Sequence, residues 1–205
     1  MTTDQPTTRS RMLRTTAQLL QRQGFHATGL KQILDESGAP RGSLYFHFPG
    51  GKEQLAVAAL HETTARIGRA IERTLSGHKR PQDAVRAFVH GYGEVLRRSN
   101  FVEGCPVATV TLDSAAASEP IRAACSAAYT HWHGQLRDGF VAAGLRPNRA
   151  DELATFALAA VEGALILSRA HHDTHAFDVV ADQLAALIHA AVDSPRPARR
   201  GPRRH

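Results

Sequence analysis

Residues 28–52, which read TGLKQILDESGAPRGSLYFHFPGGK, hold a dense group of side chains suited to binding nucleic acid. Arg41 can donate two parallel hydrogen bonds to a guanine edge, and Ser43 can bond to a base edge or to a phosphate. Gly42, which lies between them, lets the backbone approach a partner closely. These adjacent residues can all touch DNA if a helix presents them to the major groove.

The residues that follow add contacts to the phosphate backbone. Tyr45 and His47 carry polar tips that can reach backbone oxygens, whereas Leu44 is an apolar anchor that points inward. Lys52 follows Pro-Gly-Gly at the predicted start of a further helix. Free amides and a cation at a helix start bind a phosphate well, so we expect a phosphate contact there.

Two short helices that meet at a turn must position these side chains. Thr28 is a suitable N-cap for the first, and the apolar spacing predicts that this helix ends near Ser37. Gly38 can adopt the left-handed conformation past a helix end, and Pro40 suits the first turn of the next helix. The pattern is that of a helix-turn-helix, whose second helix enters the major groove. A helical hairpin with a purely structural role is the alternative.

The run SGAPRGSLYFHFPGGKEQL resembles the DNA-binding signature of the tetracycline-repressor (TetR) family, and the similarity extends over about residues 9–60. Together with Gly104-Cys105-Pro106, the doubled glycine before Lys52 is similar to the LmrA/YxaF-like branch, although many TetR members have a single Ser or Asn at that point. The resemblance implies that DNA is contacted by these residues: Thr28, Arg41, Ser43, Tyr45, His47 and Lys52.

Charge is unevenly distributed along the chain. Residues 1–55 contain seven Lys/Arg and four Asp/Glu, whereas residues 56–193 contain thirteen Lys/Arg and fifteen Asp/Glu. A positive N-terminal third agrees with phosphate binding but would be unremarkable without the motif. Residues 194–205 add five Arg among prolines, so we expect a disordered tail that either adds non-specific DNA affinity or only improves solubility.

Helical periodicity continues to the end of the chain and predicts no strand. Gly24 should stop the first helix, and Asn148 should cap the penultimate one. Three arginines of the first helix could lie near DNA, but a solvated helix face is the favoured interpretation: Arg9, Arg11 and Arg14. Outside the helix-turn-helix, the predicted helices span about residues 9–22, 51–76, 82–99, 106–117, 120–144, 148–172 and 174–193.

The fold class is therefore all-α. We expect a three-helix DNA-binding domain at residues 1–50, a larger helical effector-binding and dimerisation domain at 51–193, and the tail at 194–205. The family resemblance implies that the last two long helices of each chain form a four-helix dimer interface. The longest apolar run, residues 153–167, is too short and too charged for a membrane span.

The candidate ligand-binding residues are four aromatics and one carboxylate in the larger domain. Glu162 lies in an apolar helix, where a carboxylate must find a partner or shift its pKa. It could recognise a ligand, remain half exposed or pair across a dimer. The aromatics could line a pocket between helices or be ordinary core. Glu162 and the slightly acidic domain favour a neutral or cationic ligand. The aromatic candidates are Phe88, Tyr92, Trp132 and Phe156.

No catalytic, metal or cofactor site is expected. The group of His171, His172 and His175 lacks a carboxylate or Cys at matching helical spacing, so a solvated helix junction is favoured over a metal site. Cys105 has no nucleophile signature around it. Cys105 and Cys125 are the only cysteines, and residues 1–12 do not form a signal peptide, so we expect a cytoplasmic protein.

The family resemblance implies a ligand-responsive transcriptional repressor. In that mechanism a homodimer binds a palindromic double-stranded DNA operator, and a small, mostly apolar effector moves helix 51–76. The two recognition helices then no longer match successive major grooves. A transcriptional activator or a ligand-independent DNA-binding protein is the alternative, and a helical enzyme is the least favoured.

Overall fold

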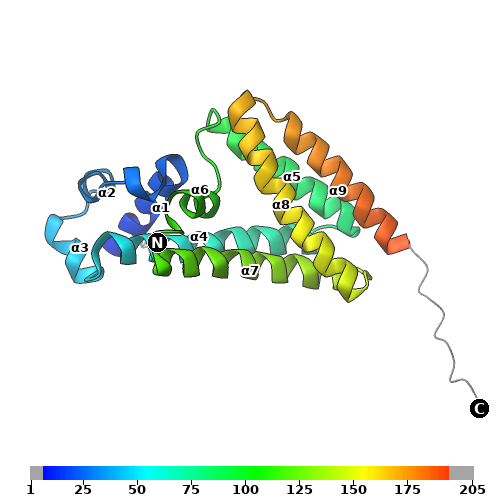
Figure 1. Cartoon of the computed structure of the whole chain (residues 1–205), viewed down its shortest axis with the longest axis horizontal. Helices are drawn as coiled ribbons and strands as arrows, with labels where there is room; N and C mark the ends of the chain where they lie inside the picture. Colours follow the sequence, from blue (N-terminus) through cyan, green and yellow to red (C-terminus); the bar gives the residue numbers. More distant parts are fainter. Residues whose placement is uncertain (1–6, 194–205) are drawn as a thin grey trace, which may run out of the picture.

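The computed structural model describes residues 7–193, which form an all-α protein (Figure 1). Within these residues no strand occurs, in agreement with the prediction. The predicted tail at 194–205 lies outside the described residues. The helices are α1 (Thr8–Ala27), α2 (Leu30–Ser37), α3 (Arg41–His47), α4 (Gly51–Ser76), α5 (Pro81–Arg98), α6 (Pro106–Ser114), α7 (Glu119–Ala142), α8 (Pro147–His171) and α9 (His175–Asp193).

Local sequence signals set most helix ends. Gly38 ends α2 in the left-handed conformation at φ 62°, as predicted. Gly24, at φ 77°, breaks the regular path of α1, and a further turn continues to Ala27. Two predictions were wrong in detail. Asn148 lies inside α8, whose N-cap is Arg146, and α6 ends at Ser114 rather than near residue 117.

The N-terminal helices and the start of α4 share one buried core. Leu13 and Leu20 of α1, Ile33 of α2 and Leu44 of α3 are all at most 2% exposed. The same core includes Leu55 of α4, so the predicted domain boundary near residue 50 falls at the start of a helix that belongs to both parts. A long α4 therefore connects the small bundle to the rest of the chain.

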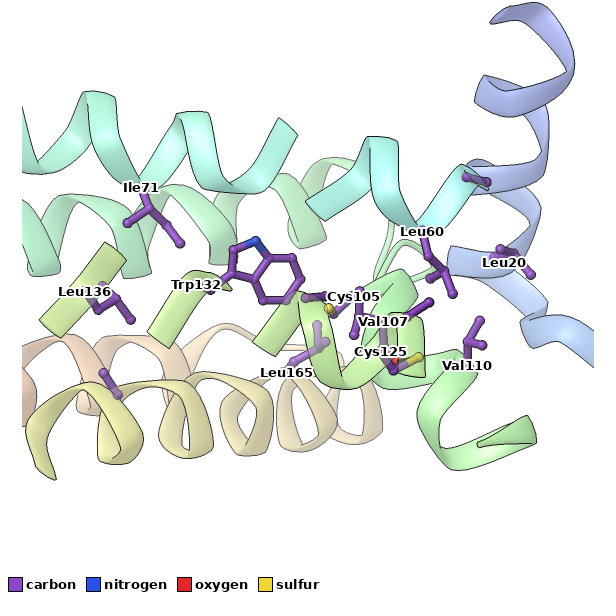
Figure 2. Close-up of a cluster of buried hydrophobic side chains, with 14 of the residues drawn as sticks. Leu20, Leu60, Ile71, Cys105, Val107, Val110, Cys125, Trp132, Leu136 and Leu165 are labelled. Carbon is purple, nitrogen blue, oxygen red and sulfur yellow. Dashed lines mark hydrogen bonds between the residues drawn. The ribbon is translucent and has the colours of Figure 1, made fainter. Parts of the chain in front are cut away.

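The long helices α4 and α7 run side by side along the molecule (Figure 1). Glycines allow this close approach, because a Cβ at Gly139 would lie 2.7 Å from the Leu75 side chain. Trp132 of α7 donates its indole N–H to the Thr64 carbonyl of α4 at 3.0 Å. Figure 2 shows the buried side chains continuing from Leu20 in α1 past Trp132 toward the far end of α7.

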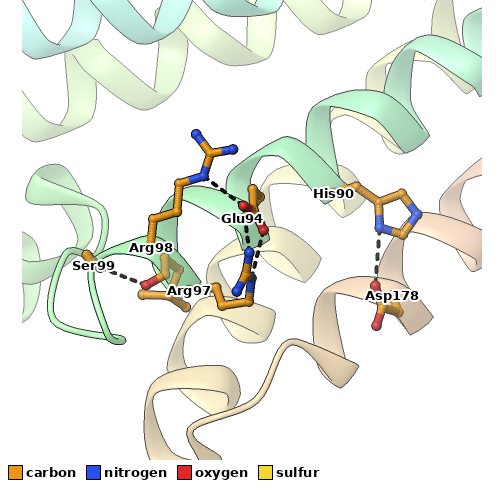
Figure 3. A network of polar contacts seen from close by, with 7 residues as sticks. His90, Glu94, Arg97, Arg98, Ser99 and Asp178 are labelled. Atoms are coloured by element: carbon orange, nitrogen blue, oxygen red, sulfur yellow. Dashed lines mark hydrogen bonds and ion pairs between the residues drawn. The ribbon is translucent and has the colours of Figure 1, made fainter.

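Helices α5, α8 and α9 form the other end of the molecule, where α5 packs on α9. His90 of α5 lies 3.2 Å from Asp178 of α9, and Glu94 binds two arginines on its own helix (Figure 3). These arginines, Arg97 and Arg98, lower the pKa of Glu94 to about 2. The contacts are solvent exposed, so packing rather than ion pairing stabilises this end.

Candidate functional site

The turn between α2 and α3 is fixed by backbone bonds and by one arginine. The Ala39 amide donates to the Leu34 carbonyl at 3.2 Å, which closes the end of α2 around Gly38. Arg11 of α1 donates to the carbonyls of Ser37 at 3.0 Å and Gly38 at 3.3 Å. The interpretation of Arg11 as part of a solvated face was therefore wrong, because its guanidinium binds the carbonyls at the end of α2.

Helix α3 presents its polar side chains outward. Leu44 is 2% exposed and anchors the helix in the core, as predicted. Arg41 and Gly42 are exposed and Ser43 is half-buried. Within residues 7–193, Arg41 makes no hydrogen bond or ion pair, so its guanidinium is available to a guanine edge.

Two aromatic side chains extend from the same helix. Tyr45 is 63% exposed, and its neighbour Phe46 is 81% exposed. The Phe46 ring lies edge-on to the half-buried His47, with 4.9 Å between ring centroids. Phe46 was not among the DNA contacts predicted from the sequence. The helical step of about 100° could have identified it, since Leu44 faces inward and Phe46 lies two steps away.

Lys52, at the start of α4, is held by α1. Its Nζ lies 4.3 Å from the centre of the Phe25 ring and donates to the His26 carbonyl at 3.4 Å. Partial burial lowers the pKa of Lys52. The expectation of free amides beside it was wrong for two residues, because the Gly50 amide donates to Gln54 Oε1 at 2.8 Å and the Gly51 amide to the Phe48 carbonyl at 2.9 Å.

Thr28 does not have the expected role. It is the C-cap of α1, and the N-cap of α2 is Gly29, which makes no side-chain capping bond. The Thr28 hydroxyl donates to the Gly24 carbonyl at 2.6 Å and the residue is 1% exposed. A buried, bonded hydroxyl cannot reach a phosphate, so the side chain of Thr28 is removed from the candidate DNA contacts.

A small cavity of about 50 Å³ lies between α4, α5, α7, α8 and α9. Three of the four predicted aromatics line it: Phe88, Tyr92 and Trp132. Phe156 does not, because it is 48% exposed on the outer surface of α8. Phe88 and Tyr92 also line a groove of about 450 Å³ on the α4 and α5 side, so they separate the cavity from that groove.

Glu162 is the one acidic side chain in the cavity wall. Its Oε1 accepts a hydrogen bond from the Tyr129 hydroxyl at 3.2 Å, whereas its Oε2 is buried without a partner. Burial raises the pKa of Glu162, although the neighbouring Cys105 thiol and Tyr129 hydroxyl act in the opposite direction. Burial therefore disfavours the charged carboxylate, and a ligand group that donates a hydrogen bond to Oε2 would offset that penalty.

Comparison with known proteins identifies the family. Residues 12–59 match the family described as bacterial regulatory proteins, tetR family, and residues 81–183 match the LmrA/YxaF-like C-terminal domain of transcriptional regulators. The chain belongs to the TetR family. The LmrA regulator of Bacillus subtilis is 38% identical over 160 residues, which cover 78% of this chain and 85% of LmrA.

Further relatives extend the match over most of this TetR-family chain. The YxaF regulator of Bacillus subtilis is 32% identical over 180 residues, which cover 88% of this chain and 94% of YxaF. The crystal structure of a TetR regulator from Legionella pneumophila superimposes with a TM-score of 0.80 at 20% identity, covering 89% of this chain and 98% of that one. These matches show a DNA-binding transcriptional regulator with a helix-turn-helix, and the predicted LmrA/YxaF-like branch is confirmed.

Proposed function

We propose that this TetR-family regulator is a homodimeric repressor that leaves a palindromic operator when a small, mostly apolar ligand enters the cavity. The main support for this proposal is that α4 reaches from the cavity to the DNA-binding helices. Its middle part supplies Ile67 and Ile71 to the cavity wall, and its first turn carries Lys52 beside the recognition helix. One rigid element thus extends from the ligand cavity to the DNA-binding surface.

The DNA-binding surface in this proposal consists of α3 and the start of α4. Arg41, Gly42 and Ser43 read base edges, and Tyr45, His47 and Lys52 hold phosphates. Phe46, which is 81% exposed, is added because an apolar side chain in the major groove can contact a thymine methyl group. Because one seven-residue helix spans few base pairs, specificity requires two half-sites. A protein that binds operators in bacterial DNA acts in the cytoplasm.

The dimer is supported by the uncovered apolar face of α8 and α9. Contrary to the sequence-based expectation, α8 has the length and hydropathy to cross a membrane, with a mean hydropathy of 1.5, and only 33% of that window is buried. A second copy of the chain would cover this face, and Ala159, Ala160 and Gly163 would let helices approach closely. Its large exposed residues are Phe156, Ile166, Leu167, Val179 and Val192.

The cavity supports a ligand with an apolar body and one hydrogen-bond donor or positive group. The wall is almost wholly apolar, and Glu162 places an unpartnered oxygen beside it. Sites for drug-sized molecules measure roughly 300–1,000 Å³, several times the present cavity. Phe88 and Tyr92 must therefore move toward the neighbouring groove when such a ligand binds. A neutral or cationic aromatic compound fits these demands.

The ligand releases DNA if it binds the DNA-free state more tightly than the DNA-bound state. A ligand with equal affinity for both states would leave the equilibrium between them unchanged. Enlarging the cavity would push against α4 at Ile67 and against Trp132, which is bonded to the Thr64 carbonyl of α4. A tilt of α4 in each subunit would change the distance between the two recognition helices. The domain division is accordingly proposed as 1–50 for DNA and 51–193 for ligand and dimer, with α4 linking both.

The proposal is tested with duplexes selected by the protein from a random pool. Binding should require two half-sites, and insertion of about five base pairs between them should abolish binding, because the half-sites then face opposite sides of the helix. Planar aromatic compounds are then titrated while the fluorescence of Trp132 and the release of DNA are followed. Compounds that change the fluorescence without releasing DNA would exclude the repressor mechanism.

A further inference from the structure

The break in α1 at Gly24 is capped by a carboxylate from a distant helix. Asp113 of α6 accepts hydrogen bonds at its Oδ2 from the Phe25 amide at 2.6 Å and the His26 amide at 2.8 Å. These amides begin the last turn of α1 after the break, where helical amides need an acceptor. A carboxylate is a strong acceptor at such a position.

The fit around Asp113 is close. A Cβ on Gly24 would lie 2.9 Å from Asp113 Oδ2, so only glycine leaves room for the carboxylate. The Ser114 hydroxyl donates to the same oxygen at 3.0 Å. Partial burial acts to raise the pKa of Asp113, but the bonds from His26, Ser114 and Phe25 hold it below its ordinary value. Asp113 is therefore ionised in the folded protein at neutral pH.

The two residues capped by Asp113 are those that hold Lys52. Lys52 Nζ lies over the Phe25 ring and donates to the His26 carbonyl. The carboxylate of Asp113 also acts on Lys52 through its charge. A chain of contacts thus leads from α6, through the turn at residues 25–27, to the cation at the start of α4.

The opposite end of α6 borders the cavity. Cys105 is the N-cap of α6 and one of the residues of the cavity wall. Helix α6 has nine residues, so about 13 Å separates its two ends. A second link lies just before it, where Glu103 pairs with Arg22 of α1 at 3.0 Å. Helix α6 therefore connects the ligand side of the molecule to the DNA-binding bundle by a route separate from α4.

We propose that Asp113 is a positioning residue for DNA binding, whose carboxylate holds the turn at residues 25–27 where it seats Lys52 against the DNA. The role rests on the proposed function. A positioning role and a purely electrostatic effect of Asp113 predict opposite changes in DNA affinity. Removing a carboxylate near a phosphate-binding surface should strengthen DNA binding by electrostatics. Loss of a positioning contact should weaken it.

The experiment compares Asp113→Ala and Asp113→Asn with Asp138→Asn, using duplexes selected by the wild-type protein. Asp138 is an exposed carboxylate on α7 that pairs with the adjacent Arg137, so its variant matches the change in charge. We expect Asp113→Ala to weaken binding about tenfold, the effect of losing charge-assisted hydrogen bonds. Asp113→Asn keeps an acceptor oxygen and should lose less, and Asp138→Asn should stay within about twofold.

Hydrogen exchange supplies the second measurement. The amides of Phe25 and His26 should exchange at least about tenfold faster in Asp113→Ala and at the wild-type rate in Asp138→Asn. Folded Asp113→Ala protein that binds DNA as tightly as wild type, or more tightly, would overturn the positioning role, as would unchanged exchange at these amides. If the wild-type protein selects no duplex, the proposed function itself fails, and this role fails with it.

Discussion

Replacing Glu162 with glutamine should stabilise the protein at neutral and alkaline pH. The carboxyl is largely buried beside the cavity, and burial raises its pKa above the ordinary value of 4.5. Well below pH 4.5 the group is protonated in both the folded and the unfolded chain and has no effect on the pH dependence of stability. As the pH rises further, the unfolded chain releases the proton while the folded chain retains it, so the free energy of unfolding falls.

The size of this loss follows from the linkage relation. Each unit by which the folded pKa exceeds the unfolded value removes about 1.4 kcal/mol from the free energy of unfolding, and the loss is complete above the folded pKa. Glutamine has nearly the same shape and no charge. The difference in free energy of unfolding between Glu162→Gln and wild type should therefore be near its minimum at about pH 4.5. It should widen as the pH rises toward the pKa of Glu162 in the folded protein.

Urea unfolding measures this difference in free energy, and the fluorescence of Trp132, the single tryptophan, reports the unfolding. Protein concentration is held constant because a dimer's stability depends on it. Glu152→Gln is the matched control, since Glu152 lies exposed on the same helix and pairs with Arg149 at 2.8 Å. Glu152→Gln should lower the free energy of unfolding by less than about 1 kcal/mol. A gap for Glu162→Gln that stays constant between pH 4.5 and 8 would refute the burial argument.

Other predictions concern DNA binding and assembly. Arg41→Ala should reduce the free energy of DNA binding by about 1–3 kcal/mol and relax the sequence preference. Lys52→Met should weaken binding to all duplexes alike and lower the slope of log affinity against log salt concentration by about one, as measured by titration at several salt concentrations. Equal effects of Arg41→Ala on selected and random duplexes would contradict base reading. Phe46→Ala should weaken DNA binding with little change in unfolding midpoint, whereas Leu44→Ala, at a 2% exposed position, should cost about 2–5 kcal/mol of stability. Ile166→Glu should yield monomers in analytical ultracentrifugation, because it places a charge in the proposed dimer face; a retained dimer would exclude that face.

Sequence reasoning predicted the features that depend on neighbouring residues. The left-handed end of α2 at Gly38 and the span of α4 from residue 51 to 76 follow from local chemistry. Gly24 interrupts α1 as its type predicts, although the helix continues to Ala27 rather than stopping. A glycine tolerates positive φ, and an apolar stripe at helical spacing must be buried wherever the helix lies. The exposed polar face of α3 follows for the same reason, because Leu44 had to point inward.

Tertiary structure decided which side chains meet across the chain. Phe156 and Phe88 have the same chemistry and lie on long helices, yet one faces outward on α8 and the other lines the cavity. Thr28 is a fitting N-cap by type, but its hydroxyl bonds to the Gly24 carbonyl instead.

The contact of Asp113 with the amides of Phe25 and His26 joins residues 88 and 87 positions apart. No sequence period connects such positions, because only the packing of α1 against α6 brings them together. The sequence alone thus determined the helices, the turn and the family. How the DNA-binding turn is joined to the cavity was decided by the folded arrangement.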